Sequence, residues 1–139
     1  MTEFSQLCDS VTKSMFQLTG HISNLQRLSN QLGTTRDTHE LRANLNTITD
    51  STKEMIKKCG DDVKKLSDLE KNLPDSLDKH QRRLKESRIT KDFQIILSRF
   101  QDIQKSILQK TKEFVSRARQ LSVSDQMREY VRSVKATNF

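Results

Sequence analysis

The 139-residue sequence has no tryptophan, one tyrosine, one proline and only three glycines. A β-sheet protein uses such residues in its turns and on its pleated faces, so this composition argues against a β-rich fold. Hydrophobic residues make up 32% of the chain, and the longest uninterrupted aliphatic run is Ile95-Ile96-Leu97. We therefore expect no transmembrane helix in this sequence, and none of it resembles a signal peptide.

Residues that carry chemistry are also scarce. The three histidines lie in separate segments, with no cysteine or carboxylate at metal-ligand spacing; they are His21, His39 and His80. The two cysteines, Cys8 and Cys59, are too far apart for a CxxC pair, which indicates reduced thiols in a reducing compartment. Glycine-rich phosphate loops and nucleophile motifs are missing. The sequence predicts a protein that is not an enzyme and that needs no metal or cofactor.

What the chain does contain is a strict repeat of apolar residues. Every seventh residue from Phe93 to Leu121 is apolar, and Ile96 and Ile103 follow members of this series by three positions. Such offsets place the side chains on one side of an α-helix, the pattern by which helices pack side by side. The repeat predicts a long helix that begins near Leu77, runs past Leu121 and forms the spine of a bundle.

A similar repeat from Phe4 to Leu32 predicts an earlier helix. Gly33 follows directly, and since only glycine adopts the left-handed conformation freely, we expect this helix to stop there.

Between these two helices, a repeat from Leu41 to Leu73 predicts another. It is preceded by Asp37, which has a glutamate three residues later, as in a capping box, so we expect Asp37 to cap this helix. Pro74 ends the helix, because proline disfavours helical angles in the residue before it. Asp75 or Ser76 is then available to cap the last helix.

The connections between these helices, at residues 33–36 and 74–76, are too short for anything but antiparallel neighbours. The expected fold is therefore all-α, an antiparallel up-down-up three-helix bundle with a long third helix, over residues 1–121. Residues 122–139 lose the repeat and are expected to form a linker. Because the apolar sides of the three helices can bury one another within one chain, we expect a monomer.

The net charge of +7 and the isoelectric point near 9.6 raise the question of acidic partners. Much of the positive charge lies in one basic cluster, comprising Lys79, Arg82, Arg83, Lys85, Arg88 and Lys91. These residues spread over several faces of a helix, which favours a solvated helix over a phosphate-binding groove. A basic module that binds acidic membrane surfaces or nucleic acid remains the alternative function.

One flank of the third helix is free of charge. This uncharged flank comprises Gln94, Leu97, Gln101, Gln104, Leu108, Thr111, Val115 and Ala118. In a chain with 31% charged residues, such a run arises by chance about one time in twenty. Two interpretations stand: the flank widens the three-helix core, or it forms a groove for a fourth helix.

Two blocks of the sequence resemble the N-terminal Habc domain of syntaxins, the Qa-SNAREs, in particular their endosomal and vacuolar members. Gln31-Leu32-Gly33-Thr34, followed by Asp37 and Leu41, is similar to the first interhelix turn of that domain. The second block, similar to its third helix, comprises residues 85–93, Phe100-Gln101, Gln104 and residues 117–119. The resemblance covers about residues 4–119.

This resemblance implies a regulatory domain in membrane fusion, on the cytosolic face of endosomal, vacuolar or related membranes. In the family, a SNARE motif and a membrane anchor follow the bundle. The bundle can fold back on the motif, or recruit tethering or Sec1/Munc18-type proteins. The sequence contains no SNARE motif and no anchor, so we expect a domain of a longer protein. The N-terminal peptide by which some relatives hold a Sec1/Munc18 protein has no room before Phe4.

Overall fold

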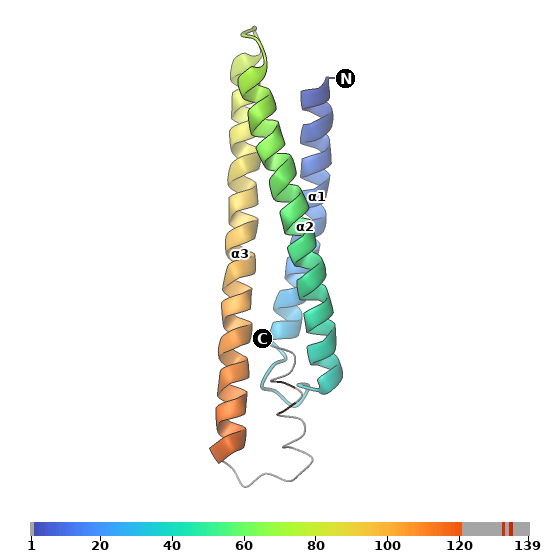
Figure 1. The fold of residues 1–139 in the computed structure, drawn as a ribbon, viewed down its shortest axis with the longest axis vertical. Helices are drawn as coiled ribbons and strands as arrows, with labels where there is room; N and C mark the ends of the chain where they lie inside the picture. Colours follow the sequence, from blue (N-terminus) through green and yellow to red (C-terminus); the bar gives the residue numbers. More distant parts are fainter. Residues whose placement is uncertain (1, 121–131, 133, 135–139) are drawn as a thin grey trace. The chain divides into compact units, whose positions relative to one another are not determined.

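The computed structural model describes residues 2–120, 132 and 134, with side chains in the third helix up to residue 117. Its three helices are α1 (Glu3–Ser29), α2 (His39–Asn72) and α3 (Lys79–Gln120) (Figure 1). The described residues include no strand. The predicted all-α three-helix fold is confirmed, and α3 is the longest helix at 42 residues.

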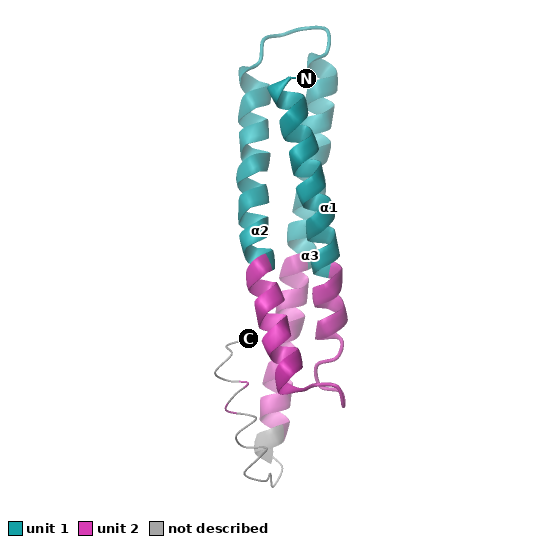
Figure 2. Cartoon of the chain, turned by 90° about the vertical axis from the view of Figure 1, so that its right-hand side faces the viewer, with its two compact units in different colours: residues 1–22, 52–99 teal, residues 23–51, 100–139 magenta. Residues whose placement is uncertain are grey.

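The chain divides into two compact units, each built from a part of all three helices (Figure 2). Unit 1 comprises Met1–Ile22 and Thr52–Arg99, and unit 2 comprises Ser23–Ser51 and Phe100–Phe139. Within each unit, successive helices run antiparallel, as the short connections require.

The core of unit 1 follows the apolar repeats. Its buried hydrophobic side chains are Phe4, Cys8, Val11, Met15, Leu18, Ile22, Cys59, Val63, Leu66, Ile89 and Ile96. Gly60 in α2 allows a close approach of α3, since a Cβ atom at this position would lie 3.3 Å from the ring of Phe93. The packing of unit 1 therefore depends on a small residue as well as on the apolar repeat.

The core of unit 2 combines an apolar repeat with polar residues. Its buried hydrophobic side chains include Leu25, Leu28, Leu32, Leu41, Leu45, Phe100, Ile103 and Ile107. Its buried polar residues are Ser29, Arg42, Thr49 and Thr111. Buried polar groups need partners inside the protein, which makes this unit the place to look for specific side-chain chemistry.

The connection between α1 and α2 confirms one prediction and corrects another. Gly33 has a φ of 78°, the left-handed conformation that the sequence predicts, although α1 ends slightly earlier, at Ser29. The prediction that Asp37 caps α2 is wrong. The cap is Thr38, whose Oγ1 accepts a hydrogen bond of 3.1 Å from the backbone N–H of Leu41. The Asp37 carboxylate instead binds Gly33 and Arg42.

The third helix begins at Lys79, two residues after the expected Leu77. Leu121 and most of the expected linker lie outside the described residues. Of that linker, only Arg132 and Val134 are described, and the Val134 side chain is 1% exposed.

Candidate functional site

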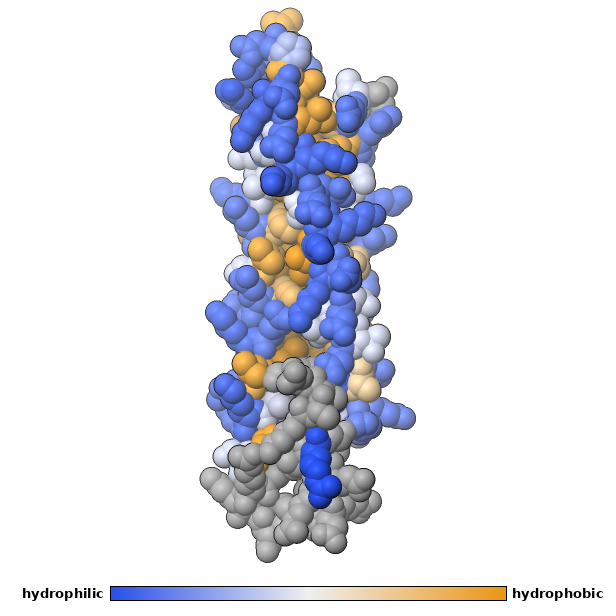
Figure 3. Space-filling model, in the orientation of Figure 1, coloured by the Kyte–Doolittle hydropathy of each residue, from blue (hydrophilic) through white to orange (hydrophobic). Residues whose placement is uncertain are grey.

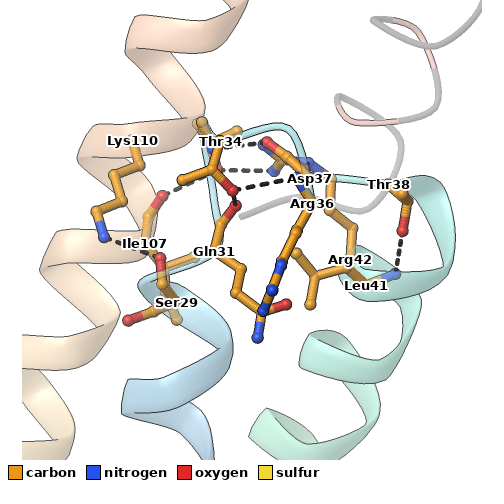
Figure 4. Close-up of polar contacts among 12 residues, drawn as sticks. Ser29, Gln31, Thr34, Arg36, Asp37, Thr38, Leu41, Arg42, Ile107 and Lys110 are labelled. Carbon is orange, nitrogen blue, oxygen red and sulfur yellow. Dashed lines mark hydrogen bonds and ion pairs between the residues drawn. The ribbon is translucent and has the colours of Figure 1, made fainter.

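A buried ion pair joins the turn between α1 and α2 to α3 (Figure 4). Arg42 donates from Nε to Asp37 Oδ1 at 3.0 Å and from Nη2 to Asp37 Oδ2 at 2.9 Å. Asp37 Oδ2 also accepts the backbone N–H of Gly33 at 2.9 Å. Arg42 Nη1 donates to Thr111 Oγ1 at 3.2 Å, and the guanidinium lies 5.4 Å from the ring centroid of Phe114. Arg42 therefore links the turn to α3.

A second contact to α3 lies at the end of α1. Lys110 Nζ donates to the backbone carbonyl of Ser29 at 2.8 Å (Figure 4). The last carbonyls of a helix lack partners in their own helix and carry partial negative charge, so a lysine there is favourable. Lys110 lies seven residues after Ile103 and fourteen after Ile96, and this contact explains why a lysine follows the two isoleucines in the series.

No sequence signal pointed to Arg42 as the centre of this network. It lies next to Leu41 in the apolar repeat of α2, and its partner Thr111 is 69 residues away. The only local signal is the pair of Gly33 and Asp37, which predicts a helix stop and a cap.

The structure distributes the uncharged flank between buried and exposed positions. In unit 2, Gln101 is exposed, Gln104 and Val115 are half-buried, and Leu108 is 40% exposed. Thr111 is buried; its Oγ1 donates to the Ile107 carbonyl and accepts from Arg42.

The other members of the flank are placed separately. In unit 1, Gln94 is exposed and Leu97 half-buried, and the Ala118 side chain lies outside the described residues. On the face drawn in Figure 3, hydrophobic residues appear as separate patches among hydrophilic ones. A partner of unit 2 could therefore reach Gln101, Gln104, Leu108 and Val115, whereas Thr111 is occupied within the unit.

The basic cluster divides into bound and exposed residues. Arg82 donates to the Pro74 carbonyl at 3.0 Å and to Ser76 Oγ at 2.9 Å, which anchors the connection before α3. Lys79 pairs with Asp75, and this hydrogen bond lowers the pKa of the Asp75 carboxyl. Asp75 and Ser76, the expected caps, are thus engaged by other side chains.

The remaining basic residues differ in the same way. Arg83 in α3 reaches the buried Glu70 of α2, with Nε 3.7 Å from Oε1. Lys85, Arg88 and Lys91 are exposed. Lys79, Arg82 and Arg83 therefore make contacts within unit 1, although the Arg83 side chain is 64% exposed, and the other three basic residues lie at the surface.

A pocket of about 460 Å³ lies in unit 1, near the start of α1. Its apolar lining comes from Phe4, Leu69 and Leu73, and its charged lining from Glu3, Asp78, Arg82 and Lys85. Because both signs of charge are present, the pocket does not select a ligand of one charge.

Both cysteines are free and buried. Burial raises the pKa of the Cys59 thiol to about 11 and also raises the pKa of Cys8, although Lys85 acts in the opposite direction. Such thiols are poor nucleophiles. The described part of the chain contains no group of His, Cys, Asp or Glu that could hold a metal ion, and no described helix is long and apolar enough to cross a membrane.

Residues 7–138 match the family of syntaxin-like proteins. The chain belongs to the syntaxin-like family. Syntaxin-7 of Rattus norvegicus is 30% identical over 115 residues, which cover 83% of this chain and 43% of the relative. Syntaxin-7 of Homo sapiens is 29% identical over 116 residues, with the same shares. The chain thus spans less than half the length of these relatives, and no solved structure matches it.

The predicted resemblance is therefore confirmed at the level of the family. In this syntaxin-like chain, the turn that carried the resemblance has a clear structural role. Gly33 supplies the left-handed conformation, and its N–H and the Arg42 guanidinium together hold the Asp37 carboxylate.

Proposed function

We propose that this chain is the N-terminal helical region of a syntaxin-type SNARE and acts as a regulatory binding module in intracellular membrane fusion. The syntaxin-like match over residues 7–138 and the three-helix fold support this proposal. In this role the chain performs no chemistry of its own. Its proposed place of action is the cytosolic face of endosomal, vacuolar or related membranes.

The proposed partner is a SNARE-motif helix, which would lie along the uncharged flank of α3 in unit 2. The observation that carries this proposal is Leu108, which is 40% exposed and has only uncharged neighbours along the flank. An amphipathic helix docks its apolar stripe in such a groove. Val134, which follows α3 in the sequence, is 1% exposed, so an apolar side chain from downstream of α3 is buried in this structure.

Sec1/Munc18-type or tethering proteins are further candidate partners of the same module. The family supports them only in general terms, and no residue of the described chain selects one of them. The SNARE-motif helix is therefore the partner that we would test first.

The test measures stability and binding separately. Leu108→Glu and Val115→Lys each put a charge where the partner's apolar stripe would dock, so affinity for the helix supplied in trans should fall at least tenfold. Because both positions are partly exposed, the free energy of unfolding should change by less than about 1.5 kcal/mol. Phe100→Ala removes a buried ring and should cost roughly 3–5 kcal/mol.

Ser116→Glu is the matched control, since it adds a charge to an exposed position of the same helix and should leave binding unchanged. If Leu108→Glu unfolds the protein as severely as Phe100→Ala does, the flank belongs to the core. Stable flank variants that bind normally would place the groove elsewhere.

A further inference from the structure

Unit 1 exposes large aliphatic side chains on α3 and just before it. Leu84 is 57% exposed, Ile95 is 55% exposed, and Leu77 in the preceding connection is 105% exposed. Leu84 and Ile95 are eleven residues apart, about three helical turns, and so lie on the same side of α3. The opposite side contains Ile89 and Ile96, which are buried. These aliphatic residues therefore mark an outward surface that the bundle does not use.

The charges on this surface are of one sign. At 100° per residue, nine residues of the part of α3 in unit 1, which ends at Arg99, fall within about 60° of Leu84, and all nine are exposed. We call them the outer face of α3; they are His80, Gln81, Leu84, Ser87, Arg88, Lys91, Ile95, Ser98 and Arg99. Within unit 1 this face holds three permanent cations and no acidic residue; the first acidic residue on the same side of α3, Asp102, lies in unit 2.

The spacing of the apolar residues argues against a second helix as the partner. A helix–helix seam needs apolar residues every three or four positions, whereas Leu84 and Ile95 are separated by eleven, with Arg88 and Lys91 between them. A bilayer surface does not require a continuous seam. It accepts cations among its phosphates and isolated aliphatic side chains at the edge of its acyl region.

We propose that the outer face of α3 docks on an anionic phospholipid surface, with Arg88, Lys91 and Arg99 at the headgroups. Leu77, Leu84 and Ile95 are the apolar contacts. Lys79 and Arg83 are not among the proposed headgroup contacts, because they already pair with Asp75 and Glu70. This proposal does not depend on the helix-binding function, since it concerns unit 1 and a different side of α3.

The experiment measures binding of the 139-residue chain to vesicles. The vesicles contain phosphatidylcholine with about 30% phosphatidylserine, or phosphatidylcholine alone, and each is tested at low and physiological salt. The wild type should bind only the anionic vesicles, more weakly at higher salt. A basic residue near such a surface contributes about fivefold in affinity, so Arg88→Glu with Lys91→Glu should weaken binding on the order of 25-fold or more.

The controls separate this face from the general positive charge of the protein. Lys57→Glu with Lys58→Glu changes the net charge equally at exposed positions of α2 in unit 1, and should weaken binding less than about threefold. Leu84→Ser with Ile95→Ser should reduce binding several-fold, whereas Phe16→Ser, at an 81% exposed position of α1, should not. Circular dichroism checks that every variant is folded.

Two results would overturn the proposal. The first is an absence of binding to anionic vesicles at low salt. The second is an equal loss for the two charge-reversed pairs, since the binding would then reflect net charge alone. If the wild type does not bind vesicles but does bind an acidic helical peptide through Arg88 and Lys91, the partner of this face is a protein and the lipid assignment is wrong.

Discussion

Arg42 is 1% exposed, and burying a charged side chain is costly unless its charge and its hydrogen-bond donors are satisfied. Here the guanidinium forms a two-point contact with Asp37, whose side chain is 3% exposed, and also reaches Thr111 and the face of Phe114. Arginine suits this role because its planar fork can contact a carboxylate, a hydroxyl and a ring at once. The syntaxin-like turn is thus organised by one residue outside it.

We expect Arg42→Met to lower the free energy of unfolding by about 3–5 kcal/mol, because the Asp37 carboxylate then loses its buried cation. Arg42→Lys should retain part of this stability, since a lysine restores the charge but not the two-point geometry. Urea unfolding of each variant measures the effect. Arg36→Met, at an exposed position of the same connection, is the control, and a loss below about 1 kcal/mol for Arg42→Met would contradict the assigned role.

The three glycines of this chain lie in three different environments, two within helices and one in the connection between α1 and α2, which allows a matched prediction. Gly20→Ala should stabilise the protein by about 1 kcal/mol, because nothing lies within 4 Å of the added Cβ and alanine favours the helix. Gly33→Ala should destabilise it by roughly 1–2 kcal/mol, because of the left-handed φ of 78°. Gly60→Ala should stabilise the protein less than Gly20→Ala does, since the added Cβ atom would lie 3.3 Å from the Phe93 ring.

Thermal unfolding of the three glycine variants checks this order. A Gly60→Ala protein as stable as Gly20→Ala would mean that the Phe93 ring moves aside freely. If Gly33→Ala leaves the unfolding temperature unchanged, the turn can adopt another conformation at little cost in free energy.

The sequence could predict those features of the elements that depend on neighbours within one helix. The seven-residue repeats identified all three helices, and Gly33 identified the end of the first. The repeat could not predict the roles of Asp37, Arg42 and Gly60, because each depends on a partner brought close by the fold. Asp37 had the spacing of a cap, but a guanidinium next to its carboxylate offers a charged partner, and Thr38 is free to cap the helix instead.

At the scale of the whole molecule, neither unit is a continuous segment of chain. If unit 1 were folded alone, its two segments would be joined by an unfolded loop of about 30 residues, Ser23–Ser51. Closing a loop of that length costs about 3 kcal/mol in chain entropy. Unit 2 alone would carry a longer loop, Thr52–Arg99. Each unit therefore loses much of its stability when the other unfolds, and this favours one cooperative transition.

The two cysteines allow this cooperativity to be tested, because both are buried in unit 1. At pH 8, a Cys59 thiol with a pKa of about 11 is about a hundredfold less ionised than a thiol with the ordinary pKa of 9.0. Because only the thiolate reacts, a thiol-alkylating reagent should label Cys59 mainly after unit 1 unfolds. We expect labelling and helical circular dichroism to show the same denaturant midpoint. Phe100→Ala, a substitution in unit 2, should lower the free energy of unfolding by roughly 3–5 kcal/mol and should therefore lower both denaturant midpoints by the same amount. If Phe100→Ala lowers the helicity in one step while the thiols of unit 1 stay protected, the two units unfold independently and the cost of closing the loop does not couple them.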